Sequence, residues 1–265
     1  MSYERLELER RGATLAIRLA RPEKLNPFDP TMIREITALC RELRTDPDTR
    51  FVVFTGKGRA FSSGADILGM GDGGASGRIA PEDAARLGQF AGQEMMRSIE
   101  QLEQVTVAAV NGICLGAGVA LILGCDFRFA AESAEFGLPE THIGYFFTWG
   151  SSPRLTRVIG PSRAKEWIMT CDRIDAEQAA RWGLIDHVVP DDRLRPGVDD
   201  LLSRIAANGP VSVRLTKKLV NAYALQGMAD LFVAEPELAT HLALTGEPAE
   251  RVAAFRSGRE KEPAR

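Results

Sequence analysis

Apolar and polar positions along the first part of the chain follow a two-residue period and then a helical one. Residues 6–19 alternate around Arg11-Gly12, which predicts a β-hairpin. Residues 32–43 carry apolar side chains at helical spacing, and Pro30 stands where a helix tolerates proline, in its first turn. The chain therefore opens with a hairpin that is followed by an amphipathic helix.

Strands and helices then alternate through the middle of the sequence. Short apolar runs at residues 51–55, 106–110 and 126–131 predict buried strands, and a helical pattern covers residues 81–103. From residue 194 onward the pattern is helical only. Alternation of this kind predicts an α/β domain with crossover connections.

One nearly uncharged segment, residues 105–125, is about as long as a membrane span. The turn signal Asn111-Gly112 interrupts it, and further glycines follow. We therefore expect a buried strand, a glycine-rich turn and a buried helix here, and no membrane partner.

Composition narrows the function classes. The chain has 265 residues, is 45% hydrophobic and carries a net charge of −3, so no strong field of either sign favours nucleic acid. Its charged N-terminus has no apolar run typical of a secretory signal. Four cysteines without paired spacing and three scattered histidines favour reduced thiols in a cytoplasmic protein and no metal site.

Three stretches combine glycines and polar groups at the ends of predicted strands. Residues 60–67 and 111–118 hold glycines at turns where the backbone can approach a ligand closely. Residues 136–144 place Glu140 in a mostly apolar setting, where desolvation would raise its pKa toward the range useful in acid–base catalysis. Each stretch alone fits an ordinary turn equally well.

Taken together, these stretches resemble the crotonase (enoyl-CoA hydratase/isomerase) superfamily. Its members carry an RPEKxNA-like stretch, an AFxxGxD turn followed by Ile or Leu, an NGxxxGxG turn with a CD pair downstream, an FGxPE element and an AxxxGLVdxVV stretch. The matching stretches in this chain are residues 21–27, 60–67, 111–118, 125–126, 136–140 and 179–189.

The resemblance implies an α/β fold, a crotonase-like spiral of ββα units with a C-terminal helical oligomerisation segment. Residues 1–195 would form an acyl-CoA-binding catalytic domain, and residues 196–265 a C-terminal helical trimerisation region. It also implies a homotrimer or a dimer of trimers, with a role in fatty acid metabolism. No cofactor is expected, because CoA enters as part of the substrate.

The resemblance also assigns roles to residues. The thioester oxygen would be held by the backbone N–H groups of Ala65 and Ala117, and Glu140 would be the acid/base. Preorganised donors of this kind are each worth about 2.7–4 kcal/mol in a comparable oxyanion hole. The residues expected around the substrate are Arg21 and Lys24 near the CoA phosphates, the backbone around Ser62 and Ser63 near the adenine, and Ala65, Asp66, Ile67, Gly116, Phe147, Trp149 and Lys261.

The chain departs from the family pattern in its acids. Two-glutamate hydratases carry a glutamate where this chain has Ala120, and isomerases often place an acid at the position of Thr148. Glu140 is then a single carboxylate, as in hydroxycinnamoyl-CoA hydratase-lyases, and would have to take a proton from water and return it to the substrate. His142, two residues away, is interpreted as a structural hydrogen-bonding residue.

The leading expectation is therefore an enoyl-CoA hydratase-like lyase. One alternative is a double-bond isomerase, since one base can shuttle a proton between C2 and C4. Others are a CoA-thioester hydrolase or decarboxylase that uses the same oxyanion hole. The missing acid also leaves open a catalytically weak acyl-CoA-binding paralogue.

Overall fold

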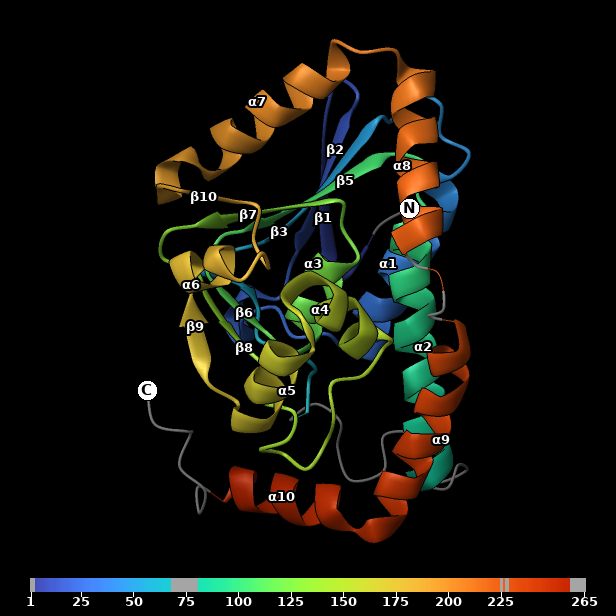
Figure 1. Ribbon diagram of the computed structural model, residues 1–265, viewed down its shortest axis with the longest axis vertical. Coiled ribbons are helices and arrows are strands. Elements are labelled where there is room, and N and C mark those ends of the chain that lie inside the picture. Colours follow the sequence, from blue (N-terminus) through green and yellow to red (C-terminus); the bar gives the residue numbers. More distant parts are fainter. Residues whose placement is uncertain (1–2, 68–80, 225, 227–228, 258–265) are drawn as a thin grey trace.

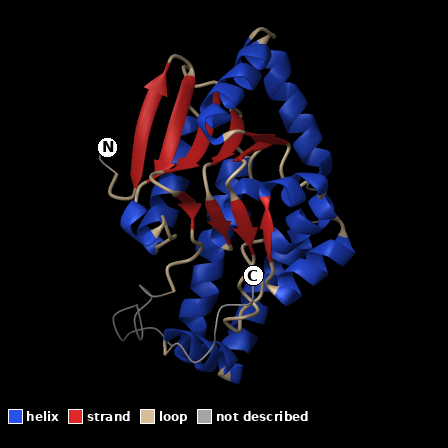
Figure 2. Cartoon of the chain, turned by 90° about the vertical axis from the view of Figure 1, so that its left-hand side faces the viewer, coloured by secondary structure: helices blue, strands red, loops and turns tan. Residues whose placement is uncertain are grey.

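The computed structural model describes residues 3–67, 81–224, 226 and 229–257, and it contains a larger and a smaller β-sheet surrounded by helices (Figures 1 and 2). The six-stranded sheet has the order β1 (Leu6–Arg11), β2 (Thr14–Leu19), β3 (Phe51–Gly56), β5 (Val105–Val110), β7 (Phe127–Ala131) and β10 (His187–Val189). The four-stranded sheet has the order β4 (Ala60–Ser62), β6 (Ile113–Leu115), β8 (Glu135–Gly137) and β9 (Arg173–Asp175).

Helices connect and cover these sheets. The α-helices are α1 (Pro30–Leu43), α2 (Pro81–Glu100), α3 (Ala117–Leu123), α4 (Ser151–Ile159), α5 (Pro161–Thr170), α6 (Ala176–Arg181), α7 (Leu194–Ala206), α8 (Pro210–Ala224), α9 (Ala229–Thr245) and α10 (Glu247–Arg256). Short 3-10 turns lie at η1 (Pro22–Lys24) and η2 (Asp191–Arg193). No helix in the described parts of the chain combines the length and apolarity needed to span a bilayer.

The predicted hairpin and first helix are confirmed. Strands β1 and β2 pair antiparallel around the turn at Gly12, whose φ of 55° lies in the region that glycine adopts without strain. Helix α1 begins at Pro30 and is capped by Asp29, whose side chain accepts a hydrogen bond from the N–H of Met32 at 2.8 Å.

The middle of the chain repeats one unit of two strands. In each unit the first strand enters the larger sheet and the second enters the smaller one, as in β3–β4, β5–β6 and β7–β8. Strands β3, β5 and β7 run parallel to one another, and so do β4, β6 and β8. The expected spiral of ββα units is confirmed, and it gives the smaller sheet three parallel strands whose carboxyl ends lie at one edge.

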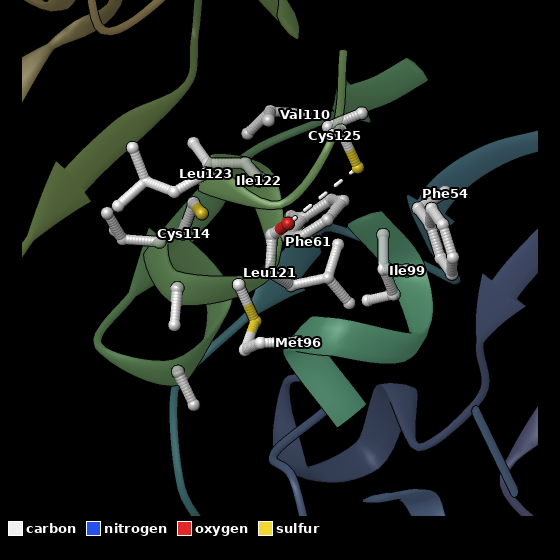
Figure 3. Close-up of a cluster of buried hydrophobic side chains, with 14 of the residues drawn as sticks. Phe54, Phe61, Met96, Ile99, Val110, Cys114, Leu121, Ile122, Leu123 and Cys125 are labelled. Atoms are coloured by element: carbon white, nitrogen blue, oxygen red, sulfur yellow. Dashed lines mark hydrogen bonds between the residues drawn. The ribbon is translucent and has the colours of Figure 1, made fainter. Parts of the chain in front are cut away.

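Helix α3 lies in the centre of the molecule, and all seven of its residues are buried. Figure 3 shows Leu121 of α3 among Phe61 of β4 and Met96 and Ile99 of α2. This apolar surrounding explains why residues 117–123 carry no charge. The predicted buried strand and buried helix in residues 105–125 are confirmed as β5 and α3, whereas the stretch expected to be a turn also contains the short strand β6.

The C-terminal helices run along the outside of the molecule. Helix α7 covers the outer face of the larger sheet through a second apolar cluster that includes Val107, Phe129 and Val198. Helix α9 lies along α2, and α10 crosses the end of the molecule opposite α7 (Figure 1). The helical character expected after residue 194 is confirmed, whereas the division into a catalytic domain and a trimerisation region stays a prediction.

Candidate active site

The turns that follow the three parallel strands of the smaller sheet meet at one place. They carry Gly64 after β4, Gly116 after β6 and Glu140 after β8. A Cβ atom placed on Gly116 would lie 2.6 Å from Glu140 Oε1 and 3.8 Å from the Cα of Gly64. The N–H of Gly116 also donates to the carbonyl of Gly137 at 3.0 Å. The carboxyl ends of parallel strands are a common location for ligand sites in α/β proteins.

Two backbone N–H groups beside this meeting point have no acceptor among the described residues. Ala117 is the first residue of α3, so its N–H cannot bond within the helix. Ala65 forms a parallel bridge with Phe28, in which Phe28 donates to the Gly64 carbonyl at 2.8 Å and Asp66 donates to the Phe28 carbonyl at 2.9 Å. Within the described residues, the N–H groups of Ala65 and Ala117 appear in no hydrogen bond. Such a pair of donors can bind an anionic oxygen.

Glu140 brings a carboxyl group to the same place. The residue is half-buried, and its Oε2 atom has no hydrogen-bond partner among the described residues. Desolvation raises the pKa of Glu140 to about 7 against the opposing effect of a backbone hydrogen bond. A carboxyl group with this pKa can both accept and return a proton near neutral pH.

Gly116 permits the close contact with Glu140. Its φ of 44° lies in the left-handed region, and any side chain would overlap the carboxylate. Gly64 has a φ of 97°, and a Cβ there would lie 3.3 Å from the carbonyl oxygen of Leu115. The two glycines therefore allow the β4 and β6 turns to lie side by side beneath the carboxyl group.

A buried group of charges fixes the turn after β4, and it corrects two sequence expectations. Arg21 is 7% exposed, and its guanidinium contacts Asp66 at 2.7 Å and Asp29 at 3.3 Å. Asp66 is itself 6% exposed. The expected contacts of Arg21 with CoA phosphates and of Asp66 with substrate do not fit this placement, because each charge is neutralised inside the protein. Both residues instead hold the turn that carries Ala65.

Asn26 contributes to the same support, and the sequence prediction gave it no role. Its side-chain oxygen accepts from the N–H of Arg21 at 2.8 Å, and its amide donates to the carbonyls of Lys57 and Ala60 at 2.9 and 2.8 Å. Asn26 is fully buried and has a φ of 55°. An asparagine two residues after the end of η1, which can adopt a left-handed conformation and bond to backbone, was the signal available in the sequence.

The serines expected near an adenine have different surroundings. Ser62 is fully buried, and its hydroxyl accepts from the N–H of Gly64 at 3.1 Å. Ser63 is half-buried, and its hydroxyl donates to the carbonyl of Lys24 at 3.3 Å. Lys24 is exposed next to it. Contacts of the backbone around Ser62 and Ser63 with the adenine, and of Lys24 with the CoA phosphates, stay predictions.

The aromatic segment after Glu140 packs into the core. Phe147 is 2% exposed and Trp149 is 8% exposed. The indole of Trp149 lies against Gly92 of α2, where an added Cβ would come within 2.2 Å of the ring. It also meets the ring of Phe28 edge-on, with centroids 6.0 Å apart. Both side chains therefore pack in the core, and a direct contact of Phe147 or Trp149 with substrate stays a prediction.

Helix α10, the last described helix, packs against two of the loops that form the site. A Cβ on Gly144 would lie 3.1 Å from Arg251 Cγ and from the Cα of Pro248 in α10. Arg256 donates to the carbonyl of Ile67 at 3.0 Å. Helix α10 of this chain is therefore in contact both with the loop that carries Glu140 and with the end of the Ala65 turn.

The roles expected for Lys261 and His142 stay predictions. Lys261 lies outside the described residues. His142 is half-buried, and its Nε2 has no partner among them. The described residues contain no group of three or more metal-binding side chains.

Comparison with known proteins identifies the family. A family model for enoyl-CoA hydratase/isomerase matches residues 9–261. A crotonyl-CoA hydratase from Syntrophomonas wolfei is 36% identical over 222 residues, which is 83% of each chain. A short-chain-enoyl-CoA hydratase from Clostridium acetobutylicum is 32% identical over 222 residues, covering 83% of this chain and 82% of the relative.

Solved structures agree with these sequence matches. An enoyl-CoA hydratase from Mycobacterium avium subsp. paratuberculosis superposes with a TM-score of 0.85 at 27% identity, covering 96% of this chain and all of the other. An enoyl-CoA hydratase/isomerase from Xanthobacter autotrophicus superposes with a TM-score of 0.84 at 29% identity, covering 98% of this chain and all of the other. The chain is thus an enzyme of the enoyl-CoA hydratase/isomerase family, a member of the crotonase superfamily.

Proposed function

We propose that this enzyme adds water across the double bond of a 2-enoyl-CoA with Glu140 as its single acid/base. The observation that carries the proposal is the contact of the Glu140 carboxyl with the Gly116 backbone, beside the two unpaired N–H groups. The names of the similar hydratases support a short 2-enoyl-CoA as substrate.

The geometry supports a stepwise route. The thioester oxygen accepts hydrogen bonds from Ala65 and Ala117, which stabilise the enolate that forms when oxygen adds at C3. The Glu140 carboxylate takes a proton from water as that water attacks C3. The same carboxyl group then gives the proton to C2, so the carboxylate is restored and one water molecule has been added.

A second acid is absent from the positions where the family can place one. Ala120 lies in the core of α3 and is 1% exposed, and Thr148 is not ionisable. Proton removal and proton return therefore fall to one group with a pKa of about 7. The same observation favours the second candidate, a double-bond isomerase, which needs one base to move a proton between C2 and C4.

We also propose that the protein assembles into homotrimers, or into dimers of trimers, in the cytoplasm. Helix α8 supports the assembly, because Val211, Leu215, Leu219 and Tyr223 repeat every four residues and are 49–81% exposed. The cysteines support the location: all four are buried and free, as is usual in a reducing compartment.

A panel of 2-enoyl-, 3-enoyl- and aryl-enoyl-CoAs, followed by mass spectrometry, separates these reactions. A product heavier by one water molecule identifies a hydratase. A product of unchanged mass with shifted absorbance identifies an isomerase, and release of free CoA identifies a hydrolase. We expect water gain on crotonyl-CoA, and a loss of about 10²–10⁴-fold in kcat for Glu140→Gln. Full turnover by that variant would contradict the assignment of Glu140, and binding without turnover of any thioester would contradict the proposed reaction.

A further inference from the structure

The turn that precedes α4 has an unusual backbone. Trp149 and Gly150 both have positive φ values, 61° and 69°. A bulky side chain rarely adopts this conformation, and such a turn persists only where surrounding contacts hold it. The contacts that hold this turn therefore identify residues on which its position depends.

Both peptide groups of Gly150 are held by buried charged side chains. Glu235 of α9 is 7% exposed, and its Oε2 accepts from the N–H of Gly150 and from Nε2 of Gln93, each at 2.7 Å. Arg154 donates to the Gly150 carbonyl at 2.6 Å and forms a buried ion pair with Glu100. The single carboxylate oxygen of Glu235 thus joins α9, α2 and the turn.

The turn leads by direct contacts to one of the two proposed oxyanion donors, Ala65. The indole of Trp149 is seated against Gly92 and meets the ring of Phe28. The backbone of Phe28 donates to the Gly64 carbonyl and accepts from the N–H of Asp66, on either side of Ala65. A shift of the Trp149 ring would therefore reach Ala65 through a single intervening residue.

We propose that Glu235 is a positioning residue that sets the oxyanion donor at Ala65 through the Trp149 turn. This inference rests on the proposed function of Ala65 as a donor to the thioester oxygen. The proposal assigns a role in catalysis to a residue of α9, in the C-terminal helical part of the chain and outside all of the site motifs.

Three variants of α9 test the inference. Glu235→Ala removes the acceptor, Glu235→Gln keeps an amide oxygen that can accept both hydrogen bonds, and Glu237→Ala is the matched control. Glu237 lies on the same helix but is exposed, and it pairs with Arg86 on the surface. We expect kcat on crotonyl-CoA to fall about tenfold or more in Glu235→Ala, because small misplacements of catalytic groups are costly.

The split between catalysis and binding separates positioning from general damage to the fold. The affinity of Glu235→Ala for unreactive butyryl-CoA should stay within about threefold of wild type, since the lost interaction is made mainly in the transition state. Glu235→Gln should recover most of kcat, and Glu237→Ala should match wild type. Wild-type kcat in Glu235→Ala, or no recovery in Glu235→Gln, would overturn the proposal.

A readout without turnover keeps this test separate from the proposed reaction. In a Glu140→Gln background, bound cinnamoyl-CoA should absorb at longer wavelength, because N–H donors polarise its conjugated carbonyl. Adding Glu235→Ala should reduce the shift, and adding Glu237→Ala should not. If the wild type hydrates no enoyl-CoA but the shift depends on Glu235, the reaction assignment fails and the positioning role stands. A shift that is unchanged by Glu235→Ala overturns the positioning role in either case.

Discussion

Two carboxyl groups within the site region show how environment decides the use of a residue. Asp66 is buried against the guanidinium of Arg21, so its charge is neutralised and serves the fold. Glu140 has no such partner among the described residues, and burial raises its pKa to about 7. The sequence predicted the unusual environment of Glu140 from its apolar neighbours. It could not predict the burial of Arg21, because an arginine in a turn is usually solvated and its two partners come together only in the fold.

The raised pKa of Glu140 predicts opposite effects of pH on activity and stability. Activity needs the carboxylate, so kcat/KM should rise with pH through an apparent pKa near 7. The folded protein binds the proton more tightly than the unfolded chain, whose Glu140 titrates near 4.5, so this residue's contribution to stability is present at low pH and lost as pH rises through 7. Glu140→Gln should therefore gain stability relative to wild type between pH 5 and pH 8, as measured by urea unfolding. A difference that does not change with pH would contradict the raised pKa.

At the scale of elements, the short strands of the smaller sheet organise the site. The sequence predicted the longer strands of the larger sheet from their apolar runs. It did not predict β4, β6, β8 and β9, because three residues are too few to show a period. The site motifs were found as separate turns, and the sheet supplies the reason that they meet: β4, β6 and β8 are parallel neighbours.

The first residue of α3 offers a test of the proposed oxyanion donor. Ala117→Pro removes the N–H at a position where helices accept proline, as α1 and α5 do at Pro30 and Pro161. We expect kcat to fall about 10²–10³-fold, the usual cost of removing one such donor. Ala176→Pro, at the first residue of α6, is the matched control and should keep its activity. Equal activity in both variants would show that the Ala117 N–H is not used.

At the scale of the whole molecule, the C-terminal helices are divided between two surroundings. Helices α9 and α10 contact α2 and the site loops of their own chain, whereas α8 presents apolar side chains to solvent. The sequence predicted that this part is helical. Periodicity alone could not show which helices fold back, since an apolar face can be covered by the same chain or by another copy.

The exposed face of α8 predicts the effect of added charge on assembly. Leu215→Glu combined with Leu219→Glu should convert the proposed trimers or hexamers into monomers, because a charge in an apolar interface loses its hydration without a partner. Light scattering coupled to size exclusion measures the change. Leu8→Glu, at a partly exposed apolar position on β1, should leave the mass unchanged. A monomeric wild type would contradict the role of α8.

The contacts of α10 also bear on the order of events during synthesis. Gly144 lies against the backbone of α10, and the carbonyl of Ile67 accepts a hydrogen bond from Arg256, so residues made earlier are supported by a helix made after them. Because a chain emerges from the ribosome N-terminus first, the turns with Gly64, Gly116 and Glu140 leave it well before that support exists. A nascent chain can therefore build its sheets and core while the loops around its reactive carboxylate still lack this support, and we expect competence for chemistry only once α10 has been made.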